Sequence, residues 1–124
     1  MPETTTLYRP VNQLELDLIA AGNWNSFPPR LPEQPIFYPV LNKKYAVQIS
    51  RDWNMPYYGA GYVVRFAVDT AYFTQFAAQN VGDAQHNELW VPAEQLAEFN
   101  QHIDWRIEVI AEFRRSCFRL LFRQ

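Results

Sequence analysis

A single stretch decides the fold, and its sequence is His86-Asn87-Glu88-Leu89-Trp90-Val91-Pro92-Ala93-Glu94. Residues 88–91 alternate polar and apolar side chains, as a half-buried strand does. Pro92 suits the first position of a helix, where no backbone N–H is needed, and Glu94 would lie near the positive end of its dipole. A strand that leads directly into a helix, in a chain whose strands lie too close together for regular βαβ winding, predicts an α+β fold. We expect a small, twisted, mainly antiparallel sheet with about two to four short helices.

Further strands are expected on both sides of this stretch. Alternation is clear over residues 62–68 and clearest over 105–113, where every second side chain from Trp105 to Phe113 would face the core. A short strand is expected at residues 7–9, ended by a proline. Residues 76–81 are ambiguous, with a strand as one interpretation.

Helices are predicted from apolar spacing and from capping residues. Residues 13–21 have helical spacing, and Asn12 with Glu15 fits a capping box, so that Glu15 would reach back to the cap. Gly22 is expected to end this helix in the left-handed conformation. A second helix is predicted from Asn42, and Asp69 predicts a short helical turn after the strand at 62–68.

Two segments are predicted to be loops. Residues 23–40 hold five of the nine prolines together with several aromatic residues, which predicts a rigid loop lying over the core. Within it, residues 29–32 also match the spacing of a PxxP peptide ligand, which is the alternative. Trp53 is expected on the buried side of the helix that begins at Asn42, and residues 53–61 are expected to form a loop.

Length, composition and charge limit the class of protein. With 124 residues and 48% hydrophobic side chains, residues 1–124 are expected to form a single domain with its own core. Residues 1–6 are expected to fray, and residues 114–124 form a basic and aromatic C-terminal extension. The net charge of −2 argues against nucleic acid as a partner, and no run of residues is apolar enough for a membrane helix. A single cysteine, Cys117, and the lack of a leader favour the cytoplasm.

His86 and Glu88 are the leading candidates for chemistry. Side chains two residues apart on a strand project from the same face, about 7 Å apart at the backbone. Glu88 could then stabilise a positive charge in a transition state, while His86 orients it or holds a substrate hydroxyl. The alternative is that both side chains simply face solvent on an edge strand.

Other polar and aromatic candidates are weaker. A strand arginine such as Arg9 either faces solvent or holds a carboxylate or phosphate. Tyr58 and Tyr62 lie beside two glycines and could stack on a flat ring or pack in the core. No metal site is predicted, because the spacing of histidines and cysteines fits none, and Cys117 looks like part of an apolar stripe rather than a nucleophile.

Four segments resemble a family of short bacterial proteins of unknown role that carry a label of the ADP-ribosylation type. They are residues 7–11, 28–42, 61–66 and 88–94, and the similarity extends over most of the chain to about Phe113. The layout is also similar to that of ADP-ribosyltransferase folds. That resemblance implies NAD as a substrate, gripped by Arg9 near Tyr8, with Tyr58 or Tyr62 stacked on nicotinamide.

The same resemblance implies roles for the polar pair. Glu88 would be the catalytic carboxylate and His86 its partner two residues earlier. Two departures from the family pattern are visible, since the middle strand reads Tyr62-Val63-Val64-Arg65 with no Ser-Thr-Ser segment and His86 replaces the usual Gln or Glu. We therefore expect an ADP-ribosyltransferase-like domain that binds NAD or a related nucleotide and cleaves or transfers ADP-ribose. The alternative is a non-catalytic interaction domain, or one that self-associates into a homo-oligomer through its C-terminal tail.

Overall fold

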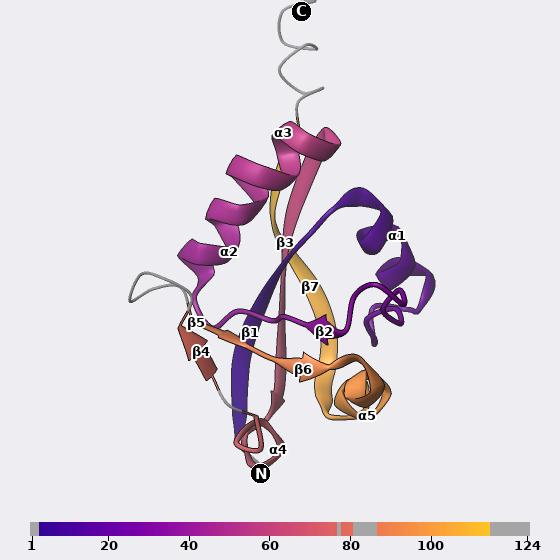
Figure 1. Ribbon diagram of the computed structural model, residues 1–124, viewed down its shortest axis with the longest axis vertical. Coiled ribbons are helices and arrows are strands. Elements are labelled where there is room, and N and C mark those ends of the chain that lie inside the picture. The colour runs from indigo at the N-terminus through magenta and orange to yellow at the C-terminus, as the bar shows by residue number, and fades with distance from the viewer. Residues whose placement is uncertain (1–2, 77, 81–86, 115–124) are drawn as a thin grey trace, which may run out of the picture.

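The computed structural model describes residues 3–76, 78–80 and 87–114. Helical segments are interspersed with strands along the chain (Figure 1). Their order is β1 (Thr4–Val11), α1 (Gln13–Ala21), β2 (Ile36–Phe37), α2 (Lys43–Ile49), the π-helical turn η1 (Ser50–Asn54), α3 (Met55–Tyr58), β3 (Ala60–Asp69), α4 (Thr70–Phe73), β4 (Ala78–Asn80), β5 (Asn87–Leu89), β6 (Val91–Pro92), the 3-10 turn η2 (Ala93–Gln95), α5 (Leu96–Gln101) and β7 (Ile103–Arg114).

The strands form one main antiparallel sheet and two short pairs. The main sheet has the order β1-β3-β7, with β3 in the centre, and the short pairs are β2-β6 and β4-β5. Val40 joins the β4-β5 pair to the main sheet, because it bridges Tyr8 of β1 on one side and Glu88 of β5 on the other. This arrangement confirms the predicted α+β class with a small antiparallel sheet.

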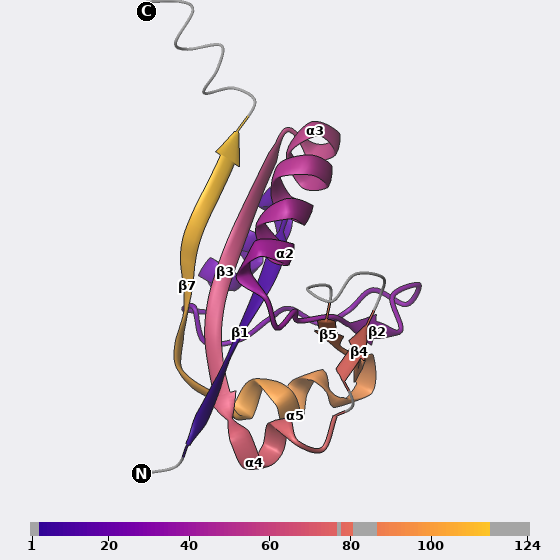
Figure 2. The same cartoon turned by 90° about the vertical axis from the view of Figure 1, so that its left-hand side faces the viewer.

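Helices cover both faces of the main sheet. Ile19 of α1 and Phe99 of α5 belong to the larger core cluster, together with inward side chains of β1 and β3 such as Leu7. Ala46 of α2 belongs to a second, smaller cluster with Val40 on the opposite face. Figure 1 shows α1 and α2 on opposite sides of the three long strands, and Figure 2 shows α2 and α3 running end to end beside the sheet, above the β4-β5 pair.

The predicted helix caps are largely confirmed. Helix α1 spans the predicted residues, and the Oδ1 atom of Asn12 accepts a hydrogen bond from the backbone N–H of Glu15 at 2.9 Å. Asn42 caps α2 in the same way. The Glu15 side chain does not reach back to its cap, because it pairs with Arg9 instead. Gly22 has φ −89° and is therefore not left-handed, so this part of the prediction was wrong.

Strand β1 is longer than predicted at both ends. It begins at Thr4, so part of the segment expected to fray is paired, with Thr4 opposite Asp69 of β3. It also continues through Pro10. Because Tyr8 directs its N–H and C=O groups toward Val40, Pro10 two residues later turns its nitrogen away from β3, and the missing N–H breaks no bond of that ladder.

The segment expected to be a loop at residues 53–61 is mostly helical. After α2 the chain makes the wider turn η1 and then α3, which ends at Gly59 with φ +88°. Trp53 was expected on the buried side, but 70% of its surface is exposed. The π-helical turn adds a residue to the helical repeat and so changes which side chains face the sheet.

Strand β7 confirms the predicted element but not its inward face. Ile107 is fully buried, whereas Trp105 is 72% exposed and Val109 is 41% exposed. Register shifts interrupt the pairing with β3 between Val63 and Val64 and again after Arg65. Each shift changes which alternate side chains face the core, and this cannot be seen in one strand alone.

The Asp69–His102 pair links the end of β3 to the residue after α5 and predicts an acid-sensitive contact. Nδ1 of His102 lies 2.6 Å from Oδ1 of Asp69, and this hydrogen bond holds the pKa of Asp69 below its usual value of 3.8. A carboxylate with a lowered pKa in the folded state stabilises the fold above its usual pKa and loses that contribution as the pH falls through its folded value. The melting-temperature difference between the wild type and Asp69→Asn should therefore shrink as the pH falls below about 4.

Asparagine keeps the N-cap of α4 in this comparison, so the variant isolates the charge. The exposed Asp104 provides the matched control. If the pH profile of Asp104→Asn matched that of Asp69→Asn, the pH dependence could not be assigned to the Asp69–His102 pair.

No helix in the described part of the chain is long and apolar enough to cross a membrane.

Candidate functional site

Two backbone bridges place Glu88 on the same face of the sheet as Tyr8. Val40 pairs antiparallel with Tyr8 of β1 and with Glu88 of β5. Directly paired residues on neighbouring strands project to the same face. This is the face against which α2 packs, because Val40 and Ala46 of α2 belong to one core cluster.

The Glu88 carboxylate lies between two aromatic donors. Nε1–H of Trp90 donates to its Oε1 atom at 2.9 Å, and the Tyr45 hydroxyl donates to its Oε2 atom at 3.5 Å. The first contact has the usual length and the second is at the long limit for a hydrogen bond. Trp90 is close because side chains two residues apart on an extended chain project the same way.

Two more tyrosines, Tyr38 and Tyr8, lie near these aromatic side chains. The ring of Tyr38 meets that of Trp90 edge-on, with centroids 6.0 Å apart. Tyr8 and Tyr45 pack against the smaller core cluster beneath. Because 41% of Trp90 and 37% of Tyr38 remain exposed, a ligand can reach these rings from solvent. We call Glu88 with these four aromatic residues the Glu88 site.

The Glu88 site has a negative charge that no basic side chain of the described residues neutralises. Some other carboxylates do have such partners, since Glu15 pairs with Arg9 and Glu108 pairs with Arg65. Burial and the neighbouring Glu88 raise the pKa of the Tyr45 hydroxyl, so it remains a protonated donor at neutral pH. A half-buried carboxylate among aromatic faces favours a cation, because both the charge and the ring quadrupoles attract it.

Arg9 lies on the other face of β1, and Glu15 already occupies its guanidinium. Its Nε and Nη2 atoms donate to the two carboxylate oxygens of Glu15 at 2.6 and 2.9 Å, and Nη1 donates to the backbone oxygen of Tyr38 at 3.2 Å. The guanidinium also lies 4.6 Å from the centroid of the Phe37 ring. The structure therefore does not bring Arg9 to Glu88, since alternation along β1 turns it away from the face of Tyr8.

The remaining predicted site residues lie apart from Glu88 or outside the described residues. Tyr62 is buried in the larger core, and its hydroxyl donates to Gln13. Tyr58 is exposed on α3, where its ring packs edge-on against Tyr57 with centroids 4.9 Å apart. Figure 1 shows α3 at the end of the α2–α3 run that lies away from β5. His86 lies outside the described residues.

Sequence reasoning missed three members of the Glu88 site. Trp90 had a usable signal, because it follows Glu88 at the two-residue spacing of a strand face. Tyr38 and Tyr45 had none, since each approaches through packing between segments that are distant in sequence. The arrangement as a whole can hold a small, flat or cationic ligand against a carboxylate.

Neither metal ligands nor similar proteins point to a further candidate site. Within the described residues, no three His, Cys, Asp or Glu side chains gather closely enough to hold a metal ion. Comparison of the chain with protein-family models, with curated protein sequences and with solved structures finds no significant match.

Proposed function

We propose that the protein binds NAD at the Glu88 site and acts as an ADP-ribosyltransferase-like protein. The observation that carries the proposal is a half-buried carboxylate that accepts hydrogen bonds from Trp90 and Tyr45 and has no basic partner among the described residues. The nicotinamide ring of NAD is flat and positively charged. It therefore matches both the carboxylate and the aromatic faces of the site.

The same carboxylate suits the chemistry of ADP-ribose transfer. The bond between ribose C1′ and the ring nitrogen breaks, and its electron pair leaves with neutral nicotinamide. The positive charge that develops on the ribose is then stabilised by Glu88. A nucleophile forms a new bond to C1′ and loses its proton, so that water yields free ADP-ribose and an acceptor group yields a modified product.

Arg9 has a different role in this proposal from the one that resemblance implies. Its bidentate contact with Glu15 lies on the opposite face of β1, so it supports the fold beneath the site rather than contacting the phosphates. The proposal requires no change in this buried pair.

Titration with NAD and NADH tests the proposal directly. The nicotinamide ring is positively charged in NAD and neutral in NADH, so NAD should bind more tightly. Removing the charge of the site in Glu88→Gln should weaken NAD binding about tenfold, bring the two affinities together and abolish nicotinamide release. Calorimetry gives the affinities, and the melting temperature of Glu88→Gln should remain close to that of the wild type.

The exposed carboxylate of Glu3 provides the control, and Glu3→Gln should bind NAD like the wild type. Equal binding of NAD and NADH by the wild type would contradict the proposal that Glu88 attracts the positively charged nicotinamide ring. No increase in the melting temperature at millimolar NAD would reject NAD as a ligand, since binding stabilises the folded state by mass action, and would favour an interaction domain.

A further inference from the structure

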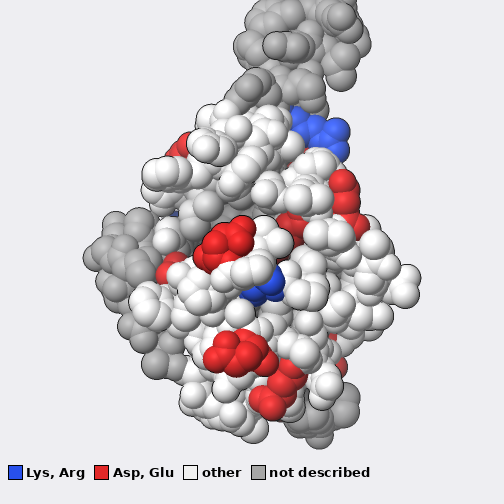
Figure 3. All heavy atoms as spheres, turned by 45° about the vertical axis from the view of Figure 1, so that its right-hand side comes forward, with Lys and Arg blue, Asp and Glu red and all other residues white. Residues whose placement is uncertain are grey.

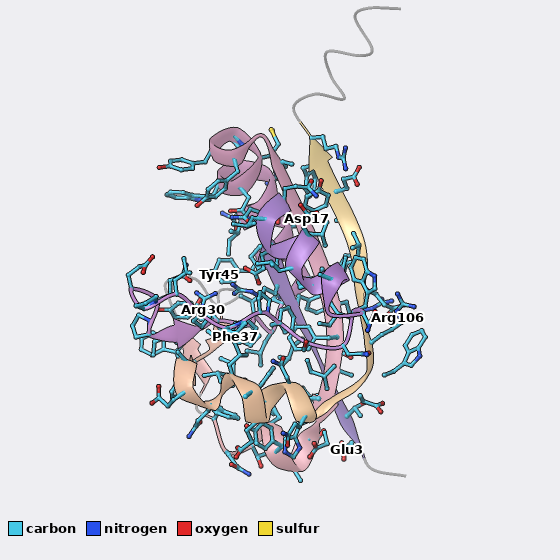
Figure 4. All side chains as sticks on the ribbon, turned by 90° about the vertical axis from the view of Figure 1, so that its right-hand side faces the viewer. Glu3, Asp17, Arg30, Phe37, Tyr45 and Arg106 are labelled. Carbon is cyan, nitrogen blue, oxygen red and sulfur yellow. The ribbon has the colours of Figure 1, made fainter. Side chains whose placement is uncertain are left out.

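A second basic side chain lies close to the Arg9–Glu15 pair without a carboxylate of its own. Arg30, in the proline-rich loop of residues 23–40, has its guanidinium 5.9 Å from the Phe37 ring centroid, and Figure 4 shows the two side chains next to each other. Its Nε atom is buried and has no hydrogen-bond partner. Burial and the positive charge of Arg9 lower the pKa of Arg30, although Glu15 acts against them.

Arg9, Arg30 and Glu15 together carry an excess of one positive charge. Glu15 is the shared carboxylate, and both of its oxygens already accept hydrogen bonds from Arg9. Arg30 therefore contributes an excess positive charge in partly buried surroundings. Such a charge is unfavourable unless an anion pairs with it.

An open groove of about 170 Å³ lies beside Arg30, between α1 and the proline-rich loop. Its apolar walls include Leu14 and Leu18 from α1 and Leu31 from the loop, which are 69%, 48% and 57% exposed. The two α1 leucines are four residues apart and therefore form one ridge of the helix. Figure 3 turns the α1 side of the molecule forward and shows a small basic patch near the middle of this face, with acidic patches above and below it.

The charge and the apolar walls of the groove favour a carboxylate over other anions. Glu15 is part of its lining, and its negative charge disfavours a doubly charged phosphate. A single carboxylate matches the excess charge of Arg30 and the planar geometry of its guanidinium. The exposed leucines add apolar area that a small inorganic ion would leave uncovered.

The carboxyl terminus of a peptide can place a carboxylate and an apolar side chain close together. Its carboxylate and its last side chain are attached to the same carbon atom, so both can enter a short groove. An internal Asp or Glu carries its carboxylate farther from the nearest apolar side chain and would need a longer groove. Capture of a terminal carboxylate is also a recurring way in which proteins recognise peptides.

We propose that the groove between α1 and the proline-rich loop binds the carboxyl terminus of a partner peptide that ends in an apolar residue, with Arg30 pairing to the terminal carboxylate. Leu14, Leu18 and Leu31 cover the last apolar side chain. The groove is distinct from the Glu88 site, because none of the residues that line it belongs to that site.

NMR titration of the full chain with a pentapeptide ending in Leu-Leu and a free carboxylate tests this site. Amide signals of α1 and of residues 28–34 should shift at millimolar peptide or below. The same peptide with an amidated terminus should bind about tenfold more weakly, because the charge is lost. A third peptide, with internal glutamate between leucines and an amidated terminus, distinguishes a side-chain carboxylate from a terminal one.

Arg30→Gln should abolish the difference between the free and amidated peptides. Its melting temperature should not fall, because the variant removes an unpaired charge next to Arg9. Arg106→Gln, on the opposite side of the molecule (Figure 4), should bind like the wild type. Equal binding of the free and amidated peptides, no shift with either, or tighter binding of the internal-glutamate peptide would overturn the proposal.

Discussion

Replacing Glu15 with alanine is expected to lower the free energy of unfolding by about 3–5 kcal/mol. Arg9 is 8% exposed and depends on Glu15 for two of its hydrogen bonds. Without that carboxylate, two guanidinium groups, those of Arg9 and Arg30, would share partly buried surroundings with no counter-charge. Urea unfolding followed by circular dichroism measures the loss.

Two further variants separate the charge effect from other effects. Asp17→Ala lies on the exposed side of the same helix and should change stability by about 0.5 kcal/mol or less. The double variant Arg9→Met with Glu15→Leu removes both charges and should recover most of the stability, as replacing a whole buried ion pair often does. A double variant as unstable as Glu15→Ala would show that packing, not charge, explains the loss.

Replacing Gly61 with alanine is expected to destabilise the fold by about 3 kcal/mol. A methyl group at this position would lie 2.4 Å from the backbone oxygen of Ser50 and 2.9 Å from Cβ of Asn54. These atoms belong to the π-helical turn, which the hydroxyl of Ser50 ties to the carbonyl of Tyr62 at 2.5 Å. The turn cannot move away without breaking that bond, so the strain remains.

Gly59→Ala is the matched control, because it should strain the backbone without producing a steric clash. Gly59 has φ +88° but no atom within 4 Å of an added Cβ, so its loss should be limited to about 1–2 kcal/mol of backbone strain. Thermal unfolding of both variants gives the comparison. A smaller loss at Gly61 than at Gly59 would contradict the close approach of the turn to β3.

Local signals predicted much of the fold. The N-caps at Asn12 and Asn42 and the alternation along β3 depend on residues that are near one another in the chain, and all three predictions were confirmed. The inward face of β7 and the position of Trp53 were predicted wrongly. Both depend on irregularities, a shift in strand register and a π-helical turn, that arise from contacts with distant segments.

The candidate site was only partly predictable for the same reason. Glu88 and Tyr8 share a face, but the residue that joins them, Val40, lies in the proline-rich loop and forms only isolated bridges. Nothing in the local sequence of Val40 indicates two partners. The pairing of Arg9 with Glu15 is different, since a strand, a cap and a first helical turn within seven residues bring the two side chains back together.

The double bridge at Val40 has a consequence for how the Glu88 site opens. The link between β1 and the strand of Glu88 is short, since Val40 exchanges two backbone hydrogen bonds with Tyr8 of β1 and Pro39 accepts one from Leu89 of β5. The strands β1 and β3, in contrast, are joined along their whole length. Local opening at this link would separate the carboxylate from Tyr8 while the three-stranded sheet stays intact. A ligand that touches both sides of the link would hold it closed, so occupancy of the site and protection of the Val40 amide from solvent exchange are thermodynamically coupled.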